Sequence, residues 1–129
     1  MLPPEATFPG EGTFLVAGVG SIGHRHLNNL KALGVHDVLL FRTGLGSPSV
    51  GPGEGEYPVE RSLEKALEPR PRAVIVSNPT SLHVETALAA ARSGAHLLIE
   101  KPLSHSTEGV DALARTVREG RLKVLMAYQ

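Results

Sequence analysis

The sequence predicts a single α/β domain in which a mostly parallel sheet lies between two layers of helices, a three-layer αβα arrangement. Short apolar runs without polar alternation recur along the chain, as they do in strands that are covered on both faces. Helical stretches with one apolar stripe lie between these runs, and repeated strand–helix–strand units form right-handed crossovers in a parallel sheet. At 129 residues, the chain has the length of one domain.

Five short runs rich in Val, Ile or Leu are the predicted strands: Thr13–Ala17, Val38–Phe41, Ala73–Val76, His96–Ile99 and Val124–Ala127. Residues 1–12 are predicted to form a flexible arm, and residues 13–129 the folded domain. The segment Thr43–Pro58 holds five glycines and three prolines, which predicts a mobile connection with room for a brief strand near Tyr57–Val59.

Turn and cap residues set the predicted ends of the helices. Gly34, Gly94 and Gly120 stand where the left-handed residue after a helix is expected. Hydroxyl side chains are predicted to cap the helix starts: Ser62 for a short helix that Pro69 ends, Thr80 or Ser81 for the next, and Ser106 or Thr107 for the last.

The composition excludes several classes of protein. The charges of thirteen basic and thirteen acidic residues cancel. The sequence has no basic tract that would indicate a nucleic-acid or membrane partner. The absence of cysteine excludes disulfides and thiolate metal sites. No signal peptide and no apolar run of the roughly 20 residues that span a bilayer are present, which predicts a cytoplasmic protein.

No metal site is predicted from the histidines. His24 and His26 are two residues apart on a predicted helix, so they point to different faces and cannot chelate one ion. Surface or packing roles are expected for them and for the scattered His36, His96 and His105.

A glycine motif follows the first predicted strand and opens the first helix, which is the context that makes the pattern G-x-G-x-x-G informative. Gly18 would permit the tight turn, Gly20 the close approach of a pyrophosphate, and Gly23 the packing of helix against strand. Three backbone N–H groups at the helix start would then face the anion, those of Ser21, Ile22 and Gly23. The alternative is a plain glycine turn.

The end of the second strand bears on which dinucleotide is bound. NAD-preferring domains place an acid there, roughly 20 residues beyond the motif. This sequence reads Arg42-Thr43 at that place, and Asp37 lies at the other end of the strand. Arg42 is suited to pair with an adenosine 2′-phosphate and Thr43 to add a hydroxyl, so the sequence favours NADP over NAD. Stacking on adenine or exposure to water are the alternatives for Arg42.

Two further segments leave the carboxyl ends of predicted strands, Ser77–His83 and Glu100–Leu103. Ligands bind at that edge of an open parallel sheet. With the glycine motif, Asn78-Pro79-Thr80 through His83 and Glu100-Lys101-Pro102 resemble the N-terminal NAD(P)-binding Rossmann domain of the Gfo/Idh/MocA oxidoreductases. The resemblance covers residues 13–129.

The resemblance implies a role for each matching residue. Lys101 would be the active-site lysine that hydrogen-bonds the substrate hydroxyl. Glu100 and Pro102 would shape its turn and help hold the nicotinamide ribose, although a structural ion pair is an equally open role for Glu100. The middle of the cofactor would lie along Asn78, Pro79 and Thr80, with His83 holding that loop.

The resemblance also implies hydride transfer between nicotinamide and a hydroxyl of a sugar, cyclitol or nucleotide-sugar. The family adds a C-terminal α/β substrate domain that is absent from this chain and carries most of the oligomer interface, so homo-oligomerisation stays open. The chain alone is expected to bind dinucleotide but turn over poorly, as a fragment or a shortened homologue. The alternatives are a non-catalytic NADP(H)-binding sensor, which would not need Lys101, and an interaction domain without nucleotide.

Overall fold

The computed structural model describes residues 12–42, 57–101, 103 and 107–127, and within them the predicted parallel sheet is confirmed. Six strands pair in the order β3-β2-β1-β4-β5-β6, and all five pairings are parallel. The strands are β1 (Phe14–Ala17), β2 (Val38–Phe41), β3 (Val59–Glu60), β4 (Ala73–Val76), β5 (His96–Glu100) and β6 (Val124–Ala127). The predicted arm lies outside the described residues except for Gly12, as does most of the connection Thr43–Pro58.

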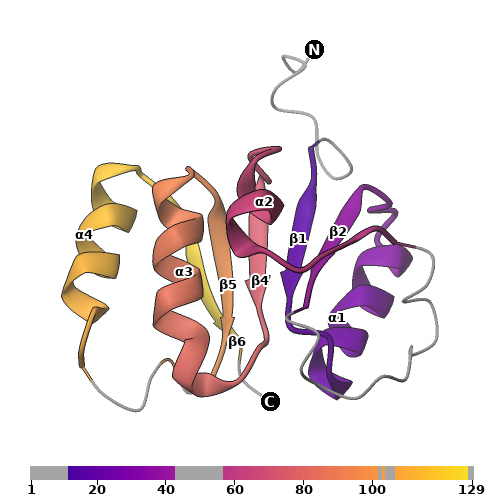
Figure 1. Cartoon of the computed structure of the whole chain (residues 1–129), viewed down its shortest axis with the longest axis horizontal. Coiled ribbons are helices and arrows are strands. Elements are labelled where there is room, and N and C mark those ends of the chain that lie inside the picture. The colour runs from indigo at the N-terminus through magenta and orange to yellow at the C-terminus, as the bar shows by residue number, and fades with distance from the viewer. Residues whose placement is uncertain (1–11, 43–56, 102, 104–106, 128–129) are drawn as a thin grey trace.

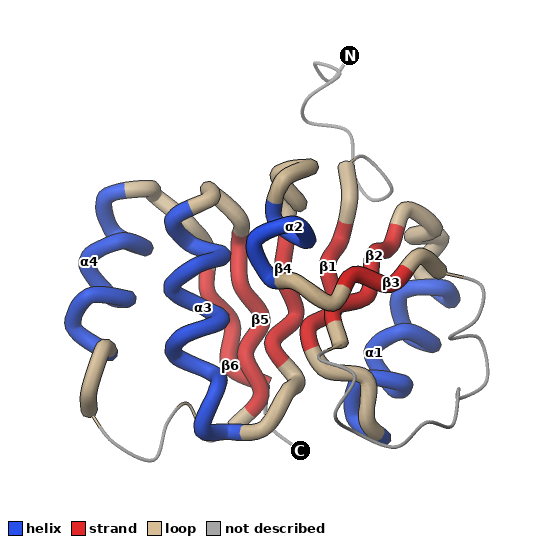
Figure 2. Tube along the Cα trace, in the orientation of Figure 1, coloured by secondary structure: helices blue, strands red, loops and turns tan. Residues whose placement is uncertain are grey.

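Helices cover both faces of the sheet, which confirms the three-layer arrangement (Figures 1 and 2). They are α1 (Ser21–Ala32), α2 (Leu63–Leu67), the 3₁₀ turn η3 (Thr80–Leu82), α3 (His83–Arg92) and α4 (Val110–Glu119). In the part of the chain that the structure describes, none of them has both the length and the apolar character that crossing a membrane requires.

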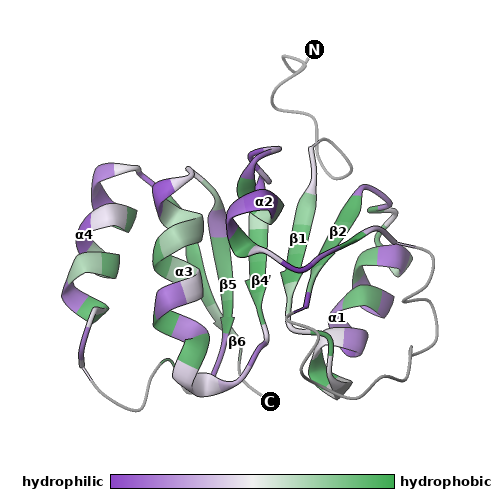
Figure 3. Ribbon diagram, in the orientation of Figure 1, coloured by the Kyte–Doolittle hydropathy of each residue, from purple (hydrophilic) through white to green (hydrophobic). Residues whose placement is uncertain are grey.

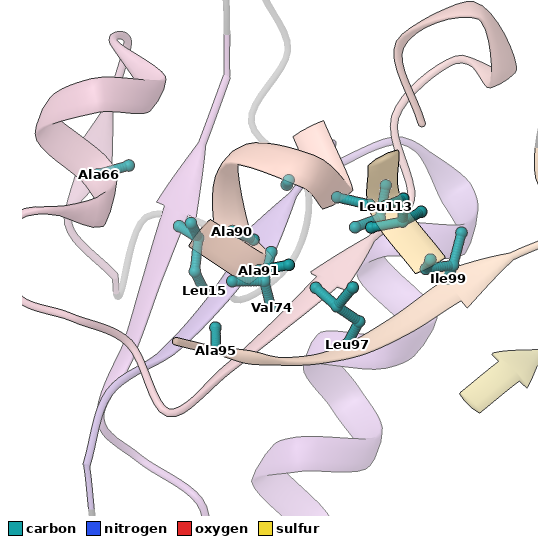
Figure 4. Packing of buried hydrophobic residues seen from close by; sticks show 12 residues of the cluster. Leu15, Ala66, Val74, Ala90, Ala91, Ala95, Leu97, Ile99 and Leu113 are labelled. Carbon is teal, nitrogen blue, oxygen red and sulfur yellow. The ribbon is translucent and has the colours of Figure 1, made fainter. Parts of the chain in front are cut away.

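The core consists of two apolar layers, one on each face of the sheet. Alternate residues of a strand point to opposite faces, so Leu15 contributes to one layer and Val16 to the other. The first layer packs α2, α3 and α4 against the strands, with Leu97 and Ile99 of β5 among its members (Figure 4). The second packs α1 against β1, β2 and Ile75 of β4. The central strands are mainly hydrophobic, whereas α1, α3 and α4 contain both hydrophilic and hydrophobic residues (Figure 3).

The predicted helix ends are confirmed in part. The Ser62 side chain accepts a hydrogen bond from the Lys65 backbone N–H at 3.3 Å and caps α2. Gly34 and Gly94 adopt left-handed φ values of +84° and +91°. The prediction for Gly120 is wrong, since its φ is −84° and Arg121 has the positive φ of 53° instead. The chain stays helical for one more residue there, and the backbone N–H of Leu122 then bonds back to Val117.

The hydroxyl caps predicted for the two later helices are wrong where the structure describes them. Thr80 and Ser81 belong to the 3₁₀ turn, so Leu82 precedes α3 and no side chain caps it. Gly109, with φ of 80°, precedes α4 instead of Thr107, and Ser106 lies outside the described residues. The brief strand predicted near Tyr57–Val59 is present at Val59–Glu60, so the two overlap at Val59.

Candidate functional site

Those predicted site residues that the structure describes lie at one edge of the sheet. Because Ala17 is in register with Phe41 and Val76, and Val76 with Ile99, the residues that follow β1, β2, β4 and β5 emerge side by side. This is the lower edge in Figure 1, where α1 and α3 begin. In open α/β sheets this edge is where ligands bind.

The glycine loop is packed tightly against the loop that follows β4. Gly18 has a φ of +96°, and a Cβ added there would overlap the backbone of Asn78. The Ser77 hydroxyl donates to the carbonyl oxygens of Gly18 at 2.7 Å and of Ala17 at 3.2 Å. The Gly18 N–H donates to the Phe41 carbonyl at 3.1 Å, so the loop is held from the strands on both sides.

The start of α1 is equally close to this loop. Gly23 is buried, and a Cβ there would overlap the carbonyl oxygen of Gly18. Only glycine therefore allows the helix to start where it does, as the motif predicts.

Gly20 differs from the other two motif glycines, because a Cβ added to it would meet no atom within 4 Å. Gly20 precedes α1 with no side-chain cap, and the first helical turn holds no acidic residue. The first N–H groups of a helix have no partner within the helix, and they favour an anion. Ile22 is half-buried, and the side chain of Ser21 lies outside the described part of the chain.

The loop after β4 is fixed by two hydrogen bonds. His83 is 2% exposed, and its Nε2 lies 2.7 Å from the Asn78 carbonyl oxygen. The Asn78 amide donates to the Thr86 hydroxyl at 2.9 Å, but its own Oδ1 is buried without a hydrogen-bond partner in the described part of the chain. A buried acceptor without a partner is costly, so its presence calls for a physical reason, such as a bound ligand or water. Pro79 is exposed and Thr80 half-buried at the outer rim.

A carboxylate and a lysine follow one another at the end of β5. Glu100 is only 8% exposed, and its Oε1 lies 2.5 Å from Nε2 of His26 on α1. Lys101 follows directly and is exposed at the sheet edge. Pro102 lies outside the described residues.

The end of β2 places Arg42 at the same edge, two strands away from β4. Arg42 is half-buried, and its backbone N–H donates to the Glu60 carbonyl of β3 at 3.1 Å. Asp37 lies at the opposite edge, as predicted, where its carboxylate accepts from the Thr13 hydroxyl at 3.1 Å. Thr43 lies outside the described residues.

Two residues of this edge, His26 and Ser77, were not predicted from the sequence. A surface or packing role was expected for His26, whereas its side chain contacts Glu100. A signal was present, since His26 falls three residues after Gly23 and four before Leu30, on the stripe of α1 that faces the sheet. A polar residue on such a stripe needs a polar partner. For Ser77 no sequence signal distinguishes it from an ordinary turn serine.

A glycine loop between the first strand and the first helix of a parallel sheet defines an α/β domain of the Rossmann class. The family model described as an oxidoreductase family with an NAD-binding Rossmann fold matches residues 13–128. The chain therefore belongs to the Gfo/Idh/MocA oxidoreductase family, which confirms the resemblance found in the sequence.

Curated relatives with 30–32% identity are dehydrogenases. Scyllo-inositol 2-dehydrogenase (NAD(+)) of Bacillus subtilis is 32% identical, covering 81% of this chain and 32% of that protein. UDP-N-acetylglucosamine 3-dehydrogenase of Acidithiobacillus ferrooxidans is 30% identical, covering 88% of this chain and 36% of that protein. The 4-carboxy-2-hydroxymuconate-6-semialdehyde dehydrogenase of a Sphingobium species is also 30% identical, covering 88% and 37%. The chain spans about a third of the length of these relatives.

Solved structures agree with the fold. The Acidithiobacillus UDP-N-acetylglucosamine 3-dehydrogenase superposes with a TM-score of 0.75 at 28% identity, covering 89% of this chain and 36% of that one. A Bordetella pertussis dehydrogenase, solved with NADH and UDP-GlcNAcA, gives a TM-score of 0.77 at 21% identity, covering 89% and 34%. The similarity to the Bordetella pertussis structure, at 21% identity, shows the fold alone.

Proposed function

We propose that this chain is the cofactor-binding half of an NAD(P)-dependent oxidoreductase. The observation that carries the proposal is the geometry of the glycine loop. Gly18 and Gly23 are packed so closely that no side chain fits, while the space beside Gly20, at the uncapped start of α1, is open. That combination is what a bound pyrophosphate requires.

The other residues of the edge fit a dinucleotide as well. The buried Asn78 Oδ1 without a partner is an acceptor suited to a ribose hydroxyl. Arg42 lies on the side of the glycine loop where the adenosine half would extend, and Lys101 on the opposite side. The order of the strands thus supports an extended cofactor that crosses the sheet edge above β1 and β4.

Lys101 is the residue we propose to act on the substrate. The bound nicotinamide ring would supply hydride exchange with the substrate carbon. Lys101 would hold the substrate hydroxyl by a hydrogen bond and move its proton, and the exposed place of Lys101 at the strand end leaves it accessible to a ligand. Glu100 would support the ribose from the strand beneath.

The substrate class we propose is a sugar, cyclitol or nucleotide-sugar with a secondary hydroxyl. Support comes from relatives that are named for scyllo-inositol and UDP-N-acetylglucosamine. Another relative is named for a semialdehyde, so a substrate screen has to include hydroxylated compounds outside the carbohydrates.

The test of the proposed function is a titration of the protein with NADPH and NADH, followed by nicotinamide fluorescence at matched salt concentration. We expect saturable binding of at least one of them, displaced by ADP. If neither dinucleotide nor ADP binds, the proposal is wrong and the glycine loop is only a turn.

NADP is the cofactor we propose as preferred, because Arg42 stands where NAD-preferring domains carry an acid. We expect NADPH to bind about tenfold more tightly than NADH, the effect of roughly one charged hydrogen bond. Arg42→Asp should abolish this preference or reverse it. The control is Arg115→Asp, on an exposed position of α4 at the opposite end of the sheet (Figure 1). Tighter binding of NADH by the wild type would refute the role of Arg42.

A further inference from the structure

The contact between His26 and Glu100 joins two elements that are distant in the sequence and not adjacent in the sheet. Residues 26 and 100 are 74 positions apart. The helix α1 follows β1, whereas Glu100 ends β5, which is separated from β1 by β4. The hydrogen bond therefore crosses the middle of the ligand-binding edge.

The helix α1 presents His26 to the sheet. Gly23, His26, Leu27 and Leu30 fall at i, i+3, i+4 and i+7, which places them on one face of a helix. Three of them are buried against the sheet, and the His26 side chain is only 14% exposed. The same helix face thus carries Gly23, which packs on the glycine loop, and His26 one turn later, which reaches Glu100.

The contact also decides where the Glu100 carboxylate lies. The side chain of Glu100 is only 11% exposed, and a carboxyl group is costly to bury unless hydrogen bonds hold it. The contact between Nε2 of His26 and Oε1 of Glu100 at 2.5 Å gives this carboxyl group a hydrogen-bond partner. Fixing Glu100 fixes the backbone that leads directly to Lys101.

We propose that His26 is a positioning residue for the nicotinamide half of the cofactor. It holds the Glu100 carboxylate, and with it the turn that presents Lys101, at the place where the nicotinamide ribose binds. The proposal rests on the proposed function, and it adds that α1 connects the pyrophosphate subsite at its start to the nicotinamide subsite one turn further on.

The test compares a ligand that reaches Glu100 with one that does not. ADP contains the adenosine and pyrophosphate groups but lacks the nicotinamide ribose, so it reports on the glycine loop and the adenosine side of the edge, and not on the nicotinamide half. For His26→Leu, we expect binding of the preferred reduced dinucleotide to weaken about tenfold. Binding of ADP should change less than about twofold, since the glycine loop is unaltered.

Two conservative variants separate positioning from packing. The amide nitrogen of glutamine reaches the place of Nε2, whereas that of asparagine reaches only the place of Nδ1. We therefore expect His26→Gln to retain dinucleotide affinity within about threefold and His26→Asn to lose about as much as His26→Leu. In a Glu100→Gln background, His26→Leu should weaken dinucleotide binding further by less than about twofold. The control is His36→Leu, an exposed histidine at the opposite edge, which should leave both affinities unchanged.

The outcomes distinguish this proposal from the proposed function. If His26 variants weaken ADP as much as the dinucleotide, or if His26→Gln fails to restore affinity, His26 acts through the fold and the inference is wrong while the proposed function stands. If the wild type binds neither ligand, the proposed function fails and this inference with it. Should His26→Leu not fold, the comparison of His26→Gln with His26→Asn decides the question.

Discussion

Replacing Gly23 with alanine is expected to destabilise the domain by about 3 kcal/mol and to abolish dinucleotide binding. The added Cβ would overlap the carbonyl oxygen of Gly18, which is backbone and cannot move aside like a flexible side chain. Gly18 is itself held by the Ser77 hydroxyl and by the Phe41 carbonyl. The start of α1 would have to shift, and the N–H groups at that start would leave their positions.

Gly20→Ala should separate binding from folding. Gly20 has a φ of −85°, which an alanine adopts without strain, and its Cβ would meet no protein atom within 4 Å. The free energy of unfolding should stay the same or rise by roughly 0.4–1 kcal/mol, because alanine lowers the conformational entropy of the unfolded chain. Dinucleotide affinity should fall at least about tenfold, because the methyl group would occupy the space where the backbone meets the pyrophosphate.

The measurement is urea denaturation followed by circular dichroism, with an NADPH titration of each folded variant. The control is Gly34→Ala, since Gly34 has a φ of +84° and open space, so only backbone strain of about 1–2 kcal/mol is expected. The NADPH affinity of Gly34→Ala should match that of the wild type. Unchanged affinity in Gly20→Ala would show that no phosphate binds at the start of α1. Full stability of Gly23→Ala would contradict the close packing of helix and loop.

Most of the sheet could be predicted because its signals are local. Each buried strand is a short apolar run, and a run such as Ala73–Val76 needs no partner to be recognised. The parallel direction followed from the helices between the runs. The glycine motif could be placed because its meaning depends on the preceding strand and the following helix, and both are in the sequence.

The errors lie where tertiary packing overrides local preference. A threonine and a serine before α3 look like caps, but Leu82 precedes the helix because Thr80–Leu82 already turns as a 3₁₀ helix. Gly120 has the residue type of a left-handed helix end, yet Leu122 packs back onto the core and the positive φ falls on Arg121. Sequence preferences name the candidates for such positions, and packing selects among them.

The same distinction holds for the candidate site. The strand ends alone predict that three site residues share one edge of the sheet, namely Gly18, Asn78 and Lys101. That His26 reaches Glu100 depends on how α1 packs on the sheet, and no spacing in the sequence reports that packing. Contacts between elements that are far apart in the sequence were therefore the part that only the structure could supply.

Lys101→Met is expected to reduce the rate of hydride transfer about 10²–10⁴-fold, the usual contribution of a positioned acid–base group. Methionine keeps an unbranched, flexible side chain and removes the charged, proton-carrying nitrogen. Lys101 is exposed at the end of β5, so the substitution should change stability by no more than about 0.5 kcal/mol. Dinucleotide affinity should stay within about threefold, because the pyrophosphate and adenosine groups bind elsewhere on the edge.

Because this chain alone is expected to turn over poorly, the measurement is initial rates at high protein concentration, with the hydroxylated substrate that the wild-type chain oxidises fastest. An NADPH titration is made on the same preparation. The matched control is Lys123→Met, an exposed lysine just before β6 at the opposite edge of the sheet, which should leave the rate and the affinity unchanged. A loss in kcat with unchanged cofactor affinity assigns Lys101 to the chemical step. Equal losses of rate and affinity would make Lys101 a cofactor ligand, and an unchanged rate would remove it from the mechanism, leaving a nucleotide-binding domain whose lysine lies only at a strand end.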